Sequence, residues 1–346
     1  MKQRRSDRRT AAGAVTAILA LTWAGASCSG MPDLPKMVEG DWQPPVLHSV
    51  RAAGVTRVEM GFDEPVELRE LAVDPPVELA GARGEGAALM LDFAEPLAAG
   101  AEYWMDATVE DHSGNISSLL VSVYGHNPAL PPVLINEVIC EGSGSRPDWV
   151  ELRTLEAGNL GGMTLYEGSP GIWDSRFVFP AMEVPAGALL VVHFKPSGDP
   201  AEQNELSDRT ASGGASSSDT GWDMWVSGGD GIPNSTGALT LTRNPGGEVM
   251  DALLYTTKFY DAGDELRGFG LASQVAIMDE LAALGVWQIS GQRLIPDDLL
   301  NPEDSTATRS INRGAGPDTD TPADWHIGPT SSASPGLPNT SEVYEG

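Results

Sequence analysis

Short runs of alternating apolar and polar residues recur along the first third of the chain. Four such runs, VLHSVRA, TRVEMGF, ALMLDF and SLLVSVY, lie between residues 46 and 124 and are separated by turns rich in Gly, Asp and Pro. Alternation with a period of two places every second side chain on the same face of a β-strand. The pattern therefore predicts an all-β domain over residues 46–127.

The alternation returns in the second half, in the runs LLVVHF, TLTR and VMDALLY. These runs predict further β-strands in this half of the chain. A segment rich in Ser, Gly and Asp interrupts them at residues 196–221, and we expect a mobile loop there. The predicted fold class is thus all-β.

A longer interruption, residues 256–307, separates the last predicted hairpin from the closing strand. Within it, Leu271, Val275, Met278 and Leu281 recur at helical spacing, with Ala282 beside the last of them. This spacing predicts one helix inside the insertion. The helix either packs on its own domain or binds a partner, and because an insertion of this size exceeds what joining two strands requires, we expect function to reside there.

The N-terminus has the pattern of an export signal. Five basic residues in the first ten are followed by an uncharged apolar run from Ala11 to Ala26, which at 16 residues is shorter than the roughly 20 that a spanning helix needs. The small residues before Cys28 resemble the lipobox of bacterial lipoproteins, which implies a signal peptide over residues 1–27 and a lipid on Cys28. The alternative is an ordinary cleaved signal. Residues 28–45, which contain four prolines, are predicted to form a tether.

The net charge limits the molecules that the chain can bind, and the cysteine count limits the disulfides that it can form. The formal net charge is −28, so the phosphate backbone of nucleic acid would be repelled and nucleic acid is excluded as a partner. Apart from Cys28 the chain has only Cys140. If Cys28 carries lipid, no internal disulfide can form, and we expect Cys140 to be a small buried apolar residue.

The first predicted domain has a family resemblance. The segments VTRVEMGFDEPVEL and DFAEPLAAGAEYWMDATVEDHSGN resemble strands and a tight Asx turn of bacterial immunoglobulin-like domains. The resemblance covers most of residues 46–127. It implies a small β-sandwich in which Asp111 and Asn115 hydrogen-bond the backbone of their own turn.

The second predicted domain resembles the lamin-tail domain. Its first hairpin reads LINEVICEGSGSRPDWVELR, and its closing segment reads SINRGAGPDTDTPADWHIGPTSSASPGLPN. The resemblance implies an immunoglobulin-like β-sandwich over residues 132–340, so the two resemblances together imply two immunoglobulin-like β-sandwich domains in tandem. It further implies that Asn136 and Glu137 are structural and that three residues belong to the core, namely Trp149, Leu152 and Trp325.

The sequence contains no recognised catalytic signature. The five histidines lack zinc-site spacing, and no G-x-S-x-G elbow or P-loop occurs. Three aspartates in GPDTDTPADW, namely Asp318, Asp320 and Asp324, offer oxygen ligands for Ca²⁺, or else cap their own turn. No cofactor other than Ca²⁺ is expected.

Three tryptophans are candidates for contact with a ligand: Trp222, Trp225 and Trp287. Exposed, they would suit a glycan or a protein; buried, they belong to the core. We therefore expect a non-enzymatic, lipid-anchored binding or adhesion module for protein or glycan, exported to the periplasmic face of a membrane or to the cell surface. The alternatives are a purely structural envelope component, or a hydrolase of polysaccharide or phosphoester in which Asp297 and Asp298 face Glu280.

Overall fold

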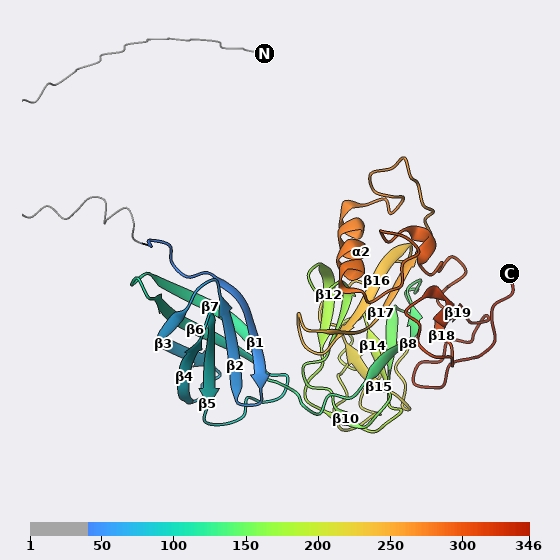
Figure 1. Ribbon diagram of the computed structural model, residues 1–346. Helices are drawn as coiled ribbons and strands as arrows, with labels where there is room; N and C mark the ends of the chain where they lie inside the picture. The colour runs from blue at the N-terminus through green and yellow to red at the C-terminus, as the bar shows by residue number, and fades with distance from the viewer. Residues whose placement is uncertain (1–40) are drawn as a thin grey trace, which may run out of the picture. The chain divides into compact units, whose positions relative to one another are not determined.

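The computed structural model describes residues 41–346 (Figure 1). The predicted signal peptide, Cys28 and most of the tether lie outside these residues. The described chain is mostly β-structure in several sheets, with one α-helix, as the alternation predicted. Within this range no helix is both long and apolar enough to cross a membrane.

Two sheets enclose a common core between residues 43 and 127. The sheet orders are β1-β2-β5-β4 and β3-β6-β7, with antiparallel pairing throughout. The strands are β1 (Leu47–Gly54), β2 (Arg57–Phe62), β3 (Val66–Asp74), β4 (Leu79–Glu85), β5 (Ala88–Phe93), β6 (Glu102–Asp111) and β7 (Ile116–Tyr124).

The core of this first sandwich follows from the alternation. Val58, Met60 and Phe62 on β2 are buried, and they share one apolar cluster with Tyr103 and Met105 on β6 of the other sheet. After β6, the carboxylate of Asp111 accepts hydrogen bonds from the backbone N–H groups of Ser113 and Asn115, both at 2.8 Å. The expected Asx turn is therefore confirmed.

A second pair of sheets follows from residue 133 onward. Its sheets have the orders β12-β11-β16-β17 and β15-β14-β9-β8-β18-β19, with β10-β13 as a small third sheet. Neighbours in the six-stranded sheet are antiparallel except β14 and β15, which are parallel. The strands are β8 (Val133–Ile139), β9 (Trp149–Thr154), β10 (Gly158–Asn159), β11 (Thr164–Gly168), β12 (Trp173–Val178), β13 (Glu183–Val184), β14 (Leu189–His193), β15 (Trp222–Trp225), β16 (Thr236–Thr242), β17 (Val249–Thr256), β18 (Ile311–Arg313) and β19 (Trp325–Ile327).

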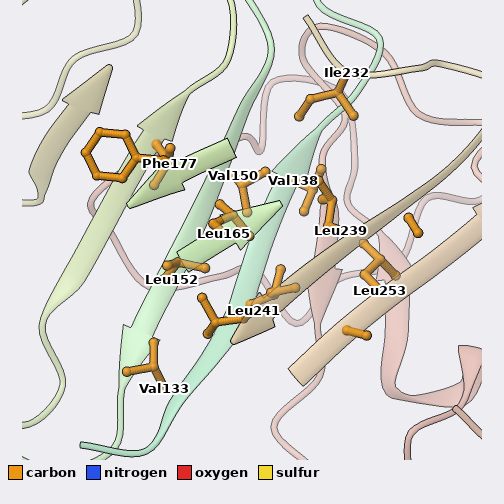
Figure 2. Packing of buried hydrophobic residues seen from close by; sticks show 14 of the residues in the cluster. Val133, Val138, Val150, Leu152, Leu165, Phe177, Ile232, Leu239, Leu241 and Leu253 are labelled. Atoms are coloured by element: carbon orange, nitrogen blue, oxygen red, sulfur yellow. The ribbon is translucent and has the colours of Figure 1, made fainter. Parts of the chain in front are cut away.

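Branched and aromatic side chains fill the space between these two sheets (Figure 2). Val150 and Leu152 from β9 lie in one cluster with Leu165 from β11 and with Leu239 and Leu241 from β16. The predicted core residues Trp149, Leu152 and Trp325 are all buried; Leu152 and Trp325 belong to this core, whereas Trp149 belongs to a smaller, separate cluster.

The insertion contains the predicted helix, α2 (Ala272–Leu284), and a 3₁₀ turn, η1 (Pro296–Asp298). The helix ends at Gly285, whose φ of 69° is left-handed and favours glycine. Met278 and Leu281 are buried in the core of the second sandwich, as the helical stripe predicted. Leu271 departs from that stripe, because it precedes the helix and is 61% exposed.

The backbone after α2 is joined to the sandwich as well. Leu300 forms a parallel bridge with Tyr255 on β17, and its N–H donates to the carbonyl of Leu254 at 3.1 Å. The insertion therefore covers the edge of the four-stranded sheet and contributes to its core. Of the two alternatives for the helix, packing on its own domain is the one observed, and a functional role for the insertion stays a prediction.

The segment 196–221 contains no helix or strand, as expected for a loop. The prediction of a mobile loop needs correction, because buried polar groups fix it in place. Glu205 is 1% exposed, and its carboxylate accepts from the N–H groups of Ser212 at 2.9 Å and Asp223 at 2.7 Å. A carboxylate that satisfies two buried donors holds the loop against β15.

Candidate functional site

The C-terminal strap, defined as residues 328–341, lies on the outer face of the six-stranded sheet. Period-two geometry puts Trp149 and Val191 on the face opposite the main core, where they form a small apolar cluster with Ile139. Ala333 of the strap packs against this cluster. The strap therefore covers a face that a two-layer sandwich would leave open.

A buried carboxylate fixes the first half of the strap. Glu137 has no exposed surface, and its oxygens accept from the Ser334 N–H at 3.0 Å and the Ser334 hydroxyl at 2.9 Å. The Ser310 hydroxyl also donates to this carboxylate. Burial raises the pKa of Glu137. The structural role predicted for Glu137 is confirmed, because its carboxylate binds the strap.

A second buried carboxylate fixes the other half. Glu151 accepts from the Gly336 N–H and from Asn136 Nδ2, each at 2.6 Å. Asn136 Nδ2 also donates to Asn339 Oδ1 at 2.7 Å, and Asn339 Nδ2 donates to the Asn136 carbonyl at 2.8 Å. Burial raises the pKa of Glu151 to about 8. Asn136 is therefore structural, as predicted, and the strap is held at several points.

A hollow of about 460 Å³ lies where the end of the strap meets the sheet. The lining residues that precede the strap differ in chemistry: Arg153 and Arg313 are cationic, His326 is polar, and Leu189 and Ala315 are apolar. The strap contributes residues 338–341 to one wall. His326 Nε2 donates to the Thr340 carbonyl at 3.1 Å, which fixes that wall.

The two arginines of the hollow differ in their partners. Arg313 Nη2 donates to both oxygens of Asp251 at 2.8 and 2.7 Å, and Nε donates to the Ile135 carbonyl at 2.7 Å. Its Nη1 forms an ion pair with Asp318 Oδ1 at 2.8 Å, although the hydrogen-bond geometry there is poor. Its charge is thus compensated within the chain.

Arg153, by contrast, forms no ion pair, although its charge acts on the Glu151 carboxylate nearby. Its Nε is buried and has no hydrogen-bond partner, and its guanidinium makes no ion pair with any residue of the described range 41–346. Sequence reasoning missed Arg153. The available signal was its position two residues after Glu151 in the strand DWVELR, which places both side chains on the same face.

The tryptophans predicted to bind a ligand do not form an exposed aromatic surface. Trp287 is 3% exposed, and its Nε1 donates to the Asp298 carbonyl at 2.9 Å. Trp222 is partly buried and packs against the core. The core alternative is therefore confirmed for Trp287, and the prediction of a binding role through its exposed ring is wrong.

Trp225 covers a buried pair that the sequence did not reveal. Its ring stacks on His193 with a centroid distance of 3.9 Å, and its Nε1 donates to Ser212 Oγ at 3.0 Å. His193 Nε2 lies 2.8 Å from Asp223 Oδ1, and both side chains are fully buried. Trp225 therefore seals a polar pair under the loop 196–221 and is not available to a ligand.

The three aspartates proposed for calcium serve other partners. Asp324 accepts from the Thr319 N–H at 2.9 Å and the Thr319 hydroxyl at 2.7 Å, at the turn that leads into η2 (Pro322–Asp324). Asp318 pairs with Arg313. Among the described residues, Asp318, Asp320 and Asp324 do not form a group of three whose oxygens all lie within 4.8 Å of one another. The turn-capping alternative is confirmed, and this geometry contradicts the calcium prediction.

Two of the three carboxylates predicted for hydrolysis, Asp298 and Glu280, accept hydrogen bonds within the chain, and the third, Asp297, is exposed. Asp298 accepts from the N–H groups of Ser290 at 3.0 Å and Ile295 at 3.1 Å. Glu280 accepts from the Ser169 hydroxyl at 2.7 Å and the Gly171 N–H at 2.9 Å. Asp298 and Glu280 thus stabilise different turns.

The second half of the chain is therefore a two-sheet β-sandwich whose outer face carries a strap and a cationic hollow. The chain belongs to the family TP_1001_2nd, described as protein second domain, whose model matches residues 131–327. An uncharacterized protein of Treponema pallidum (strain Nichols) is 26% identical over 220 residues, which are 61% of this chain and 56% of that protein. The matched segment thus spans little more than half of the relative.

Solved structures of an S-layer protein show a weak likeness. The N-terminal part of the bacterial S-layer protein SbsC has a TM-score of 0.22 at 13% identity, covering 37% of this chain and 35% of that one. Domains 1–6 of SbsC have a TM-score of 0.22 at 11% identity, covering 58% and 39%. These scores are too low to carry a structural argument. The reported matches name neither a lamin-tail nor an immunoglobulin-like domain.

Proposed function

We propose that this protein is a lipid-anchored, non-catalytic binding module of the bacterial cell envelope, which holds a protein or glycan group in the hollow beside Arg153. One observation carries the proposal: a partly buried arginine that forms no ion pair borders an open hollow whose walls are fixed by hydrogen bonds. Fixed walls favour binding because little conformational freedom is lost when the ligand enters.

The location at the envelope rests on the N-terminal sequence. A basic start, an apolar run and small residues before Cys28 are the pattern of a lipoprotein signal. Acyl chains on Cys28 would contribute about 0.8 kcal/mol per buried CH₂, which several chains can sum to stable anchoring. The anionic body would then project away from the headgroups.

The finer fold assignments belong to the same proposal. The sheet orders β1-β2-β5-β4 and β3-β6-β7 agree with the ABED and CFG sheets of constant-type immunoglobulin domains, which supports an immunoglobulin-like first domain. For the second domain, the lamin-tail motif residues Asn136, Glu137 and Asn339 join the two ends of the sandwich. Their shared structural role supports the lamin-tail resemblance.

A binding role is favoured over hydrolysis because the candidate carboxylates Asp298 and Glu280 already satisfy backbone N–H groups. A group that must activate water needs an oxygen free to approach it. A purely structural envelope component would need no cation without an ion pair at a hollow, so the binding role also accounts for Arg153.

Two measurements test the proposal. Metabolic labelling with a radioactive fatty acid should mark the full chain and leave a Cys28→Ala variant unlabelled; label on the variant would refute the anchor. Purified full-length protein in detergent should then co-sediment with envelope fragments of the producing cell. Absence of co-sedimentation with any envelope fraction would refute the binding role.

A further inference from the structure

We infer that the hollow is a carboxylate-binding site in which the Arg153 guanidinium is the recognising cation. This inference deepens the proposed binding function and rests on it. It names a ligand chemistry: a small organic molecule with a single carboxylate and a largely uncharged remainder.

The position of Arg153 is set by strands on both sides. Arg153 on β9 pairs with Leu189 on β14 and with Leu134 on β8, so its backbone is held in the middle of the six-stranded sheet. A side chain on a central strand has a well-defined direction. The guanidinium is therefore presented to the hollow by a rigid element and not by a loop.

The carboxylate of Glu151 on the same face acts on Arg153 through space but forms no ion pair with it. Glu151, two residues earlier on β9, directs one oxygen to Asn136 Nδ2 and the other to the Gly336 N–H, each at 2.6 Å. Burial also raises the pKa of Glu151, which lowers its negative charge near neutral pH. Arg153 therefore retains its positive charge beside a carboxylate that is fully occupied by the strap.

Arg153 forms no ion pair within the described range, although the chain has 49 acidic residues against 21 basic ones. Other arginines form ion pairs with acidic residues: Arg57 pairs with Asp92, and Arg313 pairs with Asp251. A buried N–H without an acceptor is destabilising. A ligand carboxylate in the hollow would bind the Nη groups of the guanidinium, whose fork its two oxygens match.

The charge on the walls favours a carboxylate over a phosphate. Arg313 lines the same hollow, but Asp251 and Asp318 already compensate its charge. Arg153 therefore leaves about one net positive charge for the ligand, which suits a monoanion better than a dianionic phosphate. The positive charge of the walls is therefore less well matched to nucleotides and other phosphorylated ligands.

The size and the remaining walls define the rest of the ligand. A volume of about 460 Å³ lies within the roughly 300–1,000 Å³ of small-molecule sites. Leu189, Ala315 and Pro338 supply apolar surface, while Thr340 and Ser341 place polar groups at the strap. An acidic sugar and an N-acylated amino acid share this chemistry, so the experiment includes both.

The test is calorimetric titration of full-length protein in detergent with glucuronate, N-acetylalanine, glucose and inorganic phosphate. We expect at least one of the two carboxylates to bind about tenfold or more tightly than glucose and phosphate. Binding of glucuronate alone would identify an acidic sugar, and binding of N-acetylalanine alone an acylated amino acid. Equal binding of glucose, tighter binding of phosphate, or no binding of either carboxylate would overturn the inference.

Variants connect the affinity to the residue. Arg153→Gln should weaken carboxylate binding by about 10- to 100-fold, the loss expected for a charge-assisted bidentate pair. Arg153→Lys should recover part of it, since the charge remains and the fork is lost. Arg146→Gln, at an exposed loop residue, is the matched control and should bind as the parent does. Unchanged affinity in a folded Arg153→Gln protein would also overturn the inference.

The two proposals fail in different ways. If no carboxylate binds but the full-length protein still co-sediments with envelope fragments, the ligand chemistry is wrong and the binding role stands. If co-sedimentation survives in the Arg153→Gln variant, the envelope partner uses another surface. Thermal melting of each variant beside the parent separates loss of binding from loss of fold.

Discussion

Replacement of Trp287 by alanine tests whether the insertion is part of the core of the second sandwich. Trp287 is 3% exposed and belongs to the same apolar cluster as Leu281 on α2 and Leu253 on β17. Its Nε1 donates to the Asp298 carbonyl at 2.9 Å. Removal of the ring therefore leaves a cavity against α2 and a buried carbonyl without its donor.

The magnitude follows from these contacts. A buried Trp→Ala change costs about 3–5 kcal/mol of unfolding free energy because the cavity only partly collapses. Trp287→Phe keeps most of the apolar volume and removes the donor, so a smaller loss of about 1–3 kcal/mol is expected. Leu284→Ala, at a residue 52% exposed at the end of α2, is the control and should change stability by about 0.5 kcal/mol or less.

Hydrogen exchange read by mass spectrometry reports this sandwich separately from the first one. Peptides of β16 and β17 should lose roughly two to four orders of magnitude of protection in Trp287→Ala, since about 1.4 kcal/mol is a factor of ten. A contrary result would be faster exchange confined to residues 260–303, with β16 and β17 unchanged. The insertion would then be an independent unit, and a short linker could replace it without unfolding the domain.

Two further predictions concern buried ionisable groups. In the folded protein the pKa of Glu151 is raised from 4.5 to about 8. The stability that Glu151 contributes is therefore fully present below pH 4.5 and is lost as the pH rises through about 8. The free energy of unfolding falls in this window by up to about 1.4 kcal/mol per pH unit. Urea unfolding of Glu151→Gln should show a flatter dependence in that window than the parent, and identical slopes would contradict the assigned burial. Cys140 is 1% exposed and its thiol pKa is raised to about 12, so native protein should resist iodoacetamide until it is unfolded. Melting temperatures with and without reductant should coincide, and a drop on reduction would mean that Cys140 forms a disulfide with another chain.

Local patterns were sufficient to predict the strands, the helix and much of the core. Alternation in TRVEMGF corresponds to the buried face of β2, and the stripe of Met278 and Leu281 corresponds to the buried face of α2. These features depend on neighbours only a few residues apart, so a sequence window contains the necessary information.

The hollow could not be predicted in this way because its walls come from distant parts of the chain. Asn136 and Asn339, which join β8 to the strap, are 203 residues apart. Nothing in the run PTSSASPGLPN signals that it will cover a sheet, because it offers few apolar side chains. The exposure of Trp287 was equally unpredictable, since it depends on where the insertion packs.

The composition of the strap explains why charged groups are buried beneath it. A segment of Ser, Pro, Gly and Thr cannot be held by apolar burial, and Leu337, its largest apolar side chain, is 50% exposed. Hydrogen bonds from its N–H groups to Glu137 and Glu151 hold it instead. Because the strap occupies Glu151, Arg153 forms no ion pair at the hollow that the strap itself completes. The hydrogen bonds that hold the strap therefore form one wall of the hollow. They also engage the Glu151 carboxylate, so the positive charge of Arg153 stays available to a ligand.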